Sequence, residues 1–375
     1  MRQRWLSAEH PDPEGFHLAI VARVAALYLK DNKDEPSEMY SFYLKDNKDE
    51  MYSPLVAAFA RAGLGEADFG MLWDFGSLFQ KERTDEQSVL FKQGLGALPM
   101  WYGHAETVIW MQPDLPDGFG MRMEALGLAQ TYESSGWCFI ESRVSAGVKL
   151  SDRRLDLGLR TDEALQTAYS GLWLDWHRLD RVCAALRPPP MLPEHVAEEL
   201  RSGRKIFTSS ADVDVVTSLY SSYFEGVTAT TTALTFSNLK WGNSEATQLG
   251  GVLPRFAGLV SLDLSVNKLG AAGAVALAAA VAVMGSLTCC DVCYNSIDGY
   301  GAAQLSAVVL ASTTIEVFNE IPVKEMRLDS FTELVVGKVQ LRAKHHTNLS
   351  AMRPTLGLVS GLNCGLEPIP SSTSP

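Results

Sequence analysis

The chain has 375 residues, of which 46% are hydrophobic, and this length is enough for two domains that each bury a core. Its formal net charge of −12 argues against a general nucleic-acid binder, which needs a basic surface to neutralise phosphates. Six cysteines without a regular framework indicate a reducing compartment, and the N-terminus lacks the apolar core of a signal peptide. We therefore expect a soluble, cytoplasmic protein with no membrane partner.

The chain opens with a predicted helix and then repeats itself. Apolar residues at helical spacing predict a helix over residues 16–29. The octapeptide at residues 28–35 recurs verbatim at residues 43–50. We interpret residues 28–53 as a duplicated, solvated insertion, because so polar a segment has little apolar surface to bury.

Strands and helices then alternate through the rest of the first half. The apolar runs 69–74 and 107–111 have the composition of buried parallel strands. Helices are predicted over residues 88–98, with a start signal at 85–87, and over residues 137–148. This alternation is typical of a doubly wound α/β domain, whose ligand site lies beyond the carboxyl ends of the strands. We assign residues 1–150 to that domain.

A helical connector is predicted over residues 151–230. Apolar spacing predicts one helix over residues 164–186 and two shorter ones over 194–202 and 212–224, which would cap the open end of a following array. Between them, the proline-rich segment 187–193 has the composition of a rigid linker.

A repeat with a period of 28 residues dominates the second half. Leu259 and Asn267 of one unit return as Leu287 and Asn295 of the next, and a constant period of this length indicates stacked structural units. The uncharged stretch 269–290 follows the same register, so we do not expect it to span a membrane.

The predicted array covers residues 231–341 and has irregular ends. A weaker copy precedes the two clear units and carries Leu239 in place of the asparagine. After Thr314 the repeat loses phase, and residues 331–341 supply one isolated strand-like unit. Residues 342–375, rich in Ser and Pro, are expected to be disordered.

The phrase Leu-x-x-Leu-x-Leu-x-x-Asn-x-Leu, which begins at Leu259, resembles the leucine-rich repeat of the ribonuclease-inhibitor type. The resemblance implies strand–helix units that stack into a curved array, with Asn267 and Asn295 paired to backbone groups at the turns. It also implies a protein partner on the concave strand face. The side chains expected to point outward there are Ser261, Asp263, Ser265, Cys289, Asp291 and Cys293.

The cysteine cluster within the second unit has the wrong surroundings for a metal. Zinc takes about four ligands, and no second Cys or His pair is evident near Cys289, Cys290 and Cys293. The repeat register explains Cys290 as a core substitute for Leu262. We therefore predict no metal site.

Three phrases of the first half carry a second resemblance, namely residues 4–5, 72–80 and 135–141. They are similar to the TIR-related domains of plant immune receptors, fungal incompatibility proteins and multidomain algal proteins. The resemblance implies that Glu141 stabilises the charge that develops as nicotinamide leaves NAD, with Trp137 as a wall of the site. The structural alternative makes Trp137 a core residue and Glu141 a first-turn acid favoured by the helix dipole.

Two functions follow from these expectations. The first is an intracellular interaction or signalling protein that binds a partner through its repeats, and for it the sequence identifies no cofactor. The alternative is a TIR-like enzyme that hydrolyses NAD with Glu141. A third interpretation, a fragment without function, rests on the irregular ends and the duplication. The oligomeric state is left open.

Overall fold

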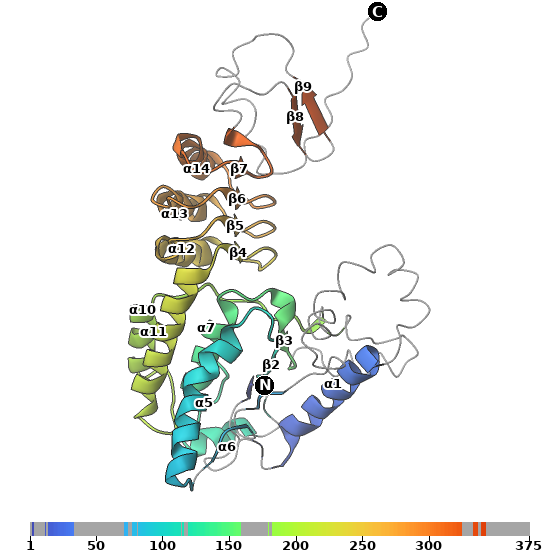
Figure 1. Cartoon of the computed structure of the whole chain (residues 1–375), viewed down its shortest axis with the longest axis vertical. Helices are drawn as coiled ribbons and strands as arrows, with labels where there is room; N and C mark the ends of the chain where they lie inside the picture. The colour runs from blue at the N-terminus through green and yellow to red at the C-terminus, as the bar shows by residue number, and fades with distance from the viewer. Residues whose placement is uncertain are drawn as a thin grey trace, which may run out of the picture.

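The computed structural model describes residues 2–3, 12, 14–33, 71–73, 77–80, 82–113, 115, 119–158, 179, 182–324, 333–336 and 339–342. These residues form an α/β structure in which two parallel sheets are each packed against helices (Figure 1). The expected α/β class is therefore confirmed. Most of the predicted helix 164–186, most of the duplicated insertion and most of the C-terminal tail lie outside the described residues. The predicted end of that helix is wrong, because residues 182–183 are helical but residues 184–186 are not: Ala184 forms a β-bridge with Leu155, and Ala185 N donates to the carbonyl of Arg154.

The first sheet contains three parallel strands in chain order, β1-β2-β3. Its strands are β1 (Arg2–Gln3), β2 (Ile109–Gln112) and β3 (Arg154–Asp156). The helices α1 (Phe16–Lys33) and α5 (Asp85–Gly103) precede β2, and α6 (Phe119–Ala125), α7 (Gly136–Ala146) and the 3-10 turn η1 (Ser151–Arg153) precede β3. The described strands run in sequence without a reversal of order, so they do not contain a topological switch point.

Helices cover both faces of this sheet, and the side chains of β2 point alternately to one face and to the other. Trp110 packs with Val21 of α1 and with Leu155 of β3 on one face. Ile109 and Met111 belong to the core that includes residues of α5 and α7 on the other. Alternating side chains that are buried on both sides are expected of a parallel strand between two helical layers.

The predicted elements of this half are confirmed with one exception. Helix α5 begins where the acidic signal placed it, since Thr84 Oγ1 accepts from Gln87 N while Thr84 N donates to Gln87 Oε1, a reciprocal capping box. The predicted strand at 69–74 is wrong where the chain is described, because residues 71–73 are neither strand nor helix. Trp73 N instead donates to Ser77 Oγ over 3.0 Å and begins a turn.

Two helices join the α/β half to the repeat array. Helices α10 (Pro193–Arg201) and α11 (Asp212–Thr230) match the two short helices that were predicted, and α11 runs six residues beyond its predicted end at 224. Phe224 of α11 meets the ring of Phe256 from the first repeat edge-on, with 6.4 Å between ring centroids. This contact fits the expectation that these helices close the first end of the array.

The proline-rich segment is packed against the array and is not a spacer. Arg187, Pro189 and Pro190 are buried, and the carbonyls of both prolines accept from Gln248 Nε2 of helix α12 (Asn243–Val252) at 3.2 and 3.1 Å. One hydrophobic core therefore runs from α5 to the last repeat strand. The linker prediction is wrong because composition reports the stiffness of a segment and not its contacts.

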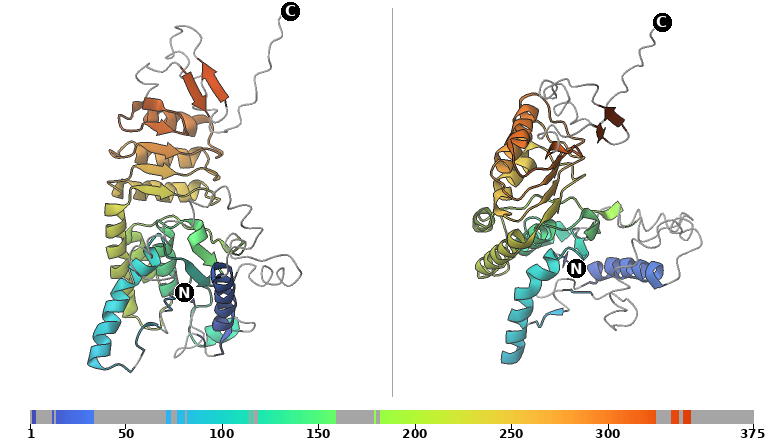
Figure 2. Two further views of the ribbon diagram at one scale, coloured as in Figure 1. Left: turned by 45° about the vertical axis from the view of Figure 1, so that its right-hand side comes forward. Right: turned by 45° about the horizontal axis from the view of Figure 1, so that its top comes forward.

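The second sheet contains four parallel strands in the order β4-β5-β6-β7. The strands are β4 (Ala233–Thr235), β5 (Ser261–Asp263), β6 (Cys289–Asp291) and β7 (Val317–Phe318). They alternate with α12 (Asn243–Val252), the 3-10 turn η2 (Leu253–Arg255), α13 (Ala271–Val281) and α14 (Gly299–Ala311). Figure 2 shows these helices stacked in one layer and the strands in another.

The sequence period is also the pairing register of the sheet. Ser261 lies opposite Ala233 on one side and Cys289 on the other, and Cys289 lies opposite Val317. Each step is 28 residues. The repeating glycines keep neighbouring helices close, since a Cβ on Gly301 would lie 2.4 Å from Ala271 Cα of the preceding helix.

The C-terminal end of the array differs from the prediction at two places. Strand β7 keeps the 28-residue register, with Ile315 and Phe318 buried, so the predicted loss of phase after Thr314 is wrong for this strand. The strands β8 (Glu333–Val336) and β9 (Val339–Arg342) pair antiparallel in a sheet of their own. The isolated repeat unit expected at residues 331–341 is therefore wrong.

The two repeated asparagines satisfy the turns as predicted. Asn267 Oδ1 accepts from Leu239 N and Trp241 N, and its Nδ2 donates to the carbonyls of Phe236, Leu264 and Ser265. Asn295 donates in the same way to the carbonyls of Leu264, Val292 and Cys293, and its Oδ1 accepts from one amide, Leu269 N, at 2.9 Å. Each asparagine thus ties its own turn to that of the preceding unit.

Candidate functional site

The candidate binding surface is the strand face of the repeat sheet that does not pack on helices. The central residue of β5, Leu262, is buried among the helix side chains. Ser261 and Asp263, which flank it, are half-exposed, and so are Cys289 and Asp291 in β6. The outward orientation predicted for these four positions is confirmed. We call Ser261, Asp263, Cys289 and Asp291 the strand face.

Two carboxylates stand side by side on the strand face. Asp263 and Asp291 are direct partners in the parallel register. Asp263 Oδ1 accepts from Ser265 N at 2.9 Å and Asp291 Oδ1 accepts from Cys293 N at 2.8 Å, so backbone turns fix both side chains. No cation within the described part of the chain forms an ion pair with either one. Like charges on neighbouring strands destabilise a sheet, so this arrangement favours a cationic partner.

The charges of these two carboxylates also affect the buried thiol of Cys290, which precedes Asp291 in β6. The pKa of Cys290 is raised, first by burial and then by the negative charges of Asp291 and Asp263. Cys290 is therefore an unreactive core thiol, as its place in the leucine register predicts.

One predicted outward residue is buried. Cys293 is only 4% exposed, so the prediction that its side chain points outward on the strand face is wrong. The strand ends at Asp291, and the turn that Asp291 Oδ1 closes breaks the alternation of exposed and buried positions. Ser265, at the equivalent place in the preceding unit, is half-exposed as predicted.

The residue after each of these turns is exposed and was not predicted. Asn238, Val266 and Tyr294 are spaced by 28 residues and share a φ of 55°, in the left-handed region. Val266 and Tyr294 are about half exposed, and a β-branched residue rarely adopts this conformation. The 28-residue spacing alone could have identified these three positions, because Val266 and Tyr294 stand where the first unit has Asn238.

Glu141 and Trp137 lie together on α7, as predicted, but in packed surroundings. Glu141 is 7% exposed, and the cavity beside it has a volume of about 10 Å³. The cavity is lined by Leu98, Pro99, Tyr102, Trp137, Ile140, Glu141, Val144 and Leu219. Such a volume is close to that of one water molecule, whereas ligand sites typically measure roughly 300–1,000 Å³.

The first turn of α7 is covered by another segment of the chain. Gly136 N donates to the carbonyl of Ile206 at 3.0 Å, and a Cβ on Gly136 would lie 2.0 Å from the ring of Phe207. Trp137 Nε1 donates to Asp212 Oδ2 of α11 at 2.8 Å. The side chain that would wall a nucleotide site is thus held by the helix packed against it, which fits the structural alternative for Trp137. The other part of that alternative is wrong, because α7 begins at Gly136 and has no acidic residue in its first turn, so Glu141 lies one turn further along the helix.

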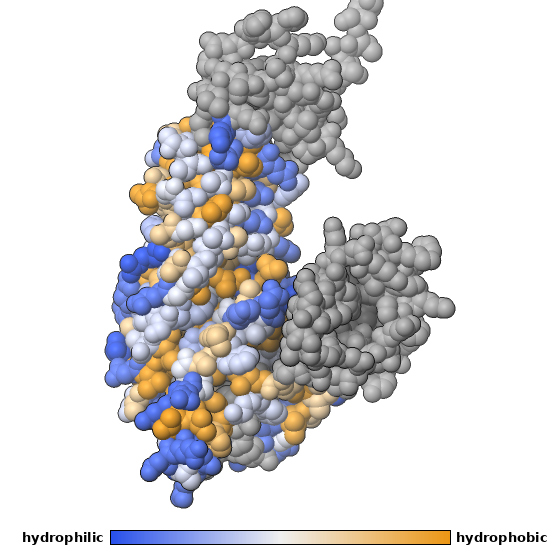
Figure 3. All heavy atoms as spheres, in the orientation of Figure 1, coloured by the Kyte–Doolittle hydropathy of each residue, from blue (hydrophilic) through white to orange (hydrophobic). Residues whose placement is uncertain are grey.

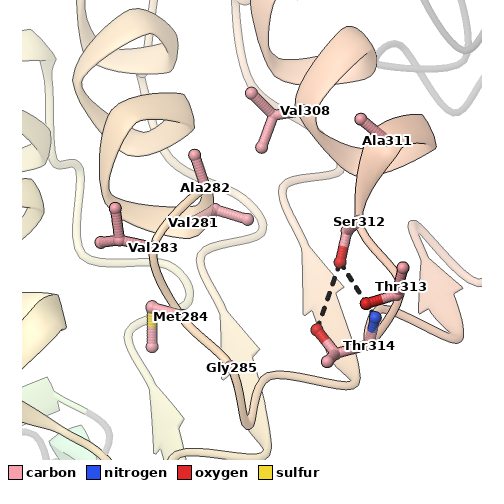
Figure 4. A pocket seen from close by; sticks show the side chains of 10 residues that line it. All are labelled: Val281, Ala282, Val283, Met284, Gly285, Val308, Ala311, Ser312, Thr313 and Thr314. Carbon is pink, nitrogen blue, oxygen red and sulfur yellow. Dashed lines mark hydrogen bonds between the residues drawn. The ribbon is translucent and has the colours of Figure 1, made fainter.

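A wider groove of about 340 Å³ lies where α13 and α14 end (Figure 4). It is lined by Val281, Ala282, Val283, Met284, Gly285, Val308, Ala311, Ser312, Thr313 and Thr314. Ser312 Oγ accepts from Thr314 N and Ile315 N and so closes the loop on one side. The lining has no ionisable side chain, so the groove lacks groups for acid–base chemistry.

No group of three or more His, Cys, Asp or Glu side chains within the described residues is placed to hold a metal ion. No helix in the same part of the chain has both the length and the hydropathy needed to cross a membrane.

Comparison with known proteins adds no relative to this picture. No protein-family model matches the chain, and no curated protein matches its sequence.

Proposed function

We propose that this protein is an interaction protein of the leucine-rich-repeat type, which binds a protein partner on its strand face. The observation that carries the proposal is the pair Asp263 and Asp291, fixed side by side on adjacent strands without a counter-ion from the described chain. A partner that presents Lys or Arg would relieve their mutual repulsion. Half-exposed Ser261 and Cys289 are small and would let a partner backbone approach the strands closely.

The α/β half is proposed to be a TIR-like domain that acts as a scaffold or signalling module. A parallel sheet with helices on both faces supports this proposal at the level of fold class. NAD cleavage is not part of it, because the cavity beside Glu141 measures about 10 Å³ and the first turn of α7 is covered by Phe207. These packed surroundings favour interaction over catalysis.

The test is partner capture with matched charge variants. Purified protein with Asp263→Lys and Asp291→Lys is compared with the wild type as bait, and captured proteins are identified and quantified. The control carries Glu198→Lys and Glu225→Lys, two exposed positions on α10 and α11 that change the net charge equally. A basic protein that is lost from the strand-face variant and kept by the control supports the proposal. Equal capture by all three baits contradicts it.

A further inference from the structure

Arg143 of α7 has a half-buried guanidinium group without a hydrogen-bond acceptor in the described part of the chain. Its Nε is closed off from solvent and has no acceptor, and neither terminal nitrogen donates to a described residue. The guanidinium carbon lies 5.0 Å from the centroid of the Phe139 ring, one turn earlier in the same helix. Withdrawing a charge from water without a partner is costly, so this group calls for an acceptor.

The other arginines that the structure describes as buried or half-buried do have partners. Arg83, Arg154 and Arg187 each donate to a backbone carbonyl. Arg153 forms an ion pair with a glutamate. The lack of an acceptor is therefore specific to Arg143 and is not a general property of this fold.

A second cation approaches the same aromatic ring. Lys205 Nζ lies 4.1 Å from the centroid of the Phe139 ring, and the lysine side chain is only 10% exposed. It donates to the carbonyl of Glu133 at 2.7 Å and pairs with Glu199 Oε1 at 3.4 Å. An ammonium group has three N–H donors, so one remains for a further acceptor. Two cationic groups thus stand around one ring, and each has a donor left to offer.

Positive charge exceeds negative charge around these two cations. Glu199 is shared between Lys205 and Arg204, and the hydrogen bond from Arg204 lowers the pKa of the Glu199 carboxyl. Burial lowers the pKa of Arg143, and the largest opposing effect is the charge of Glu133, whose side chain is exposed. Arginine stays protonated at neutral pH. One guanidinium charge is therefore left without a carboxylate at this place.

Backbone bonds hold the two cations in a fixed relation. Gly136 N donates to the carbonyl of Ile206 at 3.0 Å, and Ile206 N donates to the carbonyl of Ser134 at 2.7 Å. These bonds join the loop before α7 to the segment after α10 that carries Lys205. Figure 1 places α10 at the outer margin of the molecule beside α11, and Figure 3 shows hydrophilic residues gathered over that region. Donors fixed in advance bind an anion without the cost of ordering them.

We propose that Arg143 and Lys205 form a binding site for the phosphate group of a small soluble ligand. A guanidinium offers two parallel N–H groups to two oxygens, and a lysine adds a point charge. A phosphate monoester carries a charge of about −1.5 to −2 at neutral pH, which matches two cations better than a carboxylate does. Because both cations are recessed, a terminal phosphate reaches them more readily than a membrane surface. The inference is independent of the partner proposed for the strand face.

The first test is isothermal titration calorimetry of the full chain with inorganic phosphate in a low-chloride buffer. The variants are Arg143→Met and, as a control with the same change in charge, Arg255→Met at an exposed position of the first repeat. Wild type and control should bind one phosphate per chain, and Arg143→Met should bind at least about tenfold more weakly. Absence of saturable binding by the wild type, or equal binding by Arg143→Met, overturns the proposal.

Two further titrations identify the source of the anion. Acetate that binds as tightly as phosphate would overturn the assignment to a phosphate group. Vesicles that contain phosphatidic acid are compared with free phosphate in the same buffer. A wild-type chain that binds the vesicles but not free phosphate would overturn the assignment to a small soluble ligand.

Unfolding in urea separates an anion site from a structural arginine. Arg143→Met removes an unpaired charge and should raise the unfolding midpoint without phosphate, whereas added phosphate should stabilise only the wild type and Arg255→Met. Glu133→Gln keeps the backbone carbonyl that Lys205 uses and should tighten phosphate binding several-fold. A similar loss of stability in Arg143→Met and Glu133→Gln would show that these two side chains pair with each other, and would overturn the proposal.

Discussion

The indole Nε1 of Trp241 donates a hydrogen bond of 2.8 Å to the backbone carbonyl of Arg187, and both residues are buried. Trp241 stands where the next two repeats have Leu269 and Ile297. The guanidinium of Arg187 in turn donates to the carbonyls of Lys149 and Thr235. The first repeat thus differs from its neighbours at the position that fastens the array to the α/β half.

Breaking this fastening should destabilise the contact between the halves. Arg187→Ala removes the buried donors to Lys149 and Thr235 and should cost about 3 kcal/mol of unfolding free energy. Trp241→Phe removes only one donor and should cost less. Urea unfolding measures the loss, and hydrogen exchange at Thr235 localises it. A single unfolding transition with wild-type midpoint in Arg187→Ala would contradict this role.

The turn asparagines should be among the most sensitive residues of the array. Asn267→Ala leaves the amides of Leu239 and Trp241 without their acceptor in a buried turn. Each orphaned group costs about 1–3 kcal/mol, so the two together should cost the variant about 2–6 kcal/mol. Ser296→Ala, at an exposed position of the next turn, is the control and should change little. Equal unfolding midpoints for the two variants would show that the hydrogen bonds of Asn267 are not needed for the stability of the array.

The repeat array could be predicted from the sequence alone, because its pattern is periodic and the residues that define each unit lie close together in the chain. The spacing of Leu262 and Cys290 determines which strand residues are buried, and the asparagine position determines the turn. Strand β7 was missed because its turn asparagine, Asn319, comes four residues earlier than the register requires. In the structure Asn319 still accepts from Val292 N at 2.8 Å.

The parts that sequence did not predict depend on residues far apart in the chain. Arg187 and Trp241 are 54 positions apart, so the proline-rich segment between the halves looked like a linker. Gly136 meets Phe207, which covers the first turn of α7. The positions of Trp137 and Glu141 on one helical face could be predicted, but the packing around them could not.

Alkaline pH should destabilise the contact between α11 and the proline-rich segment, where Tyr220 bonds to Met191. Its hydroxyl donates to the carbonyl of Met191 at 2.7 Å, and burial raises its pKa to about 12. The unfolded chain loses this proton near pH 10, whereas the folded chain keeps it until about pH 12. Stability should therefore fall as the pH rises above 10, by about 1 kcal/mol at pH 11 from this residue. Tyr220→Phe should be less stable than the wild type at pH 8 and should show a shallower loss between pH 9 and 11 in urea titrations.

Val266 should lower the stability of the protein, because its backbone is held in the left-handed region while its side chain is exposed. Its φ of 55° suits asparagine, which occupies the equivalent position 238. Val266→Asn should stabilise the protein by about 1 kcal/mol, and the reciprocal Asn238→Val should destabilise it by a similar amount. Thermal unfolding of the two variants checks both signs. If partner capture falls in Val266→Asn while stability rises, the exposed turn row belongs to the binding surface. A destabilised Val266→Asn would show that no strain is stored there.

Nicotinamide release from NAD should be absent at every protein concentration, and Glu141→Ala should leave that result unchanged. The cavity beside Glu141 has a volume of about 10 Å³, and Trp137 is held by its bond to Asp212. Phe207→Ala tests whether packing is the barrier, because it removes the ring that covers Gly136. Release should stay absent in this variant as well if Glu141 is structural. Release by the wild type that disappears in Glu141→Ala would contradict the interaction proposal for this half and would establish an enzyme in its place.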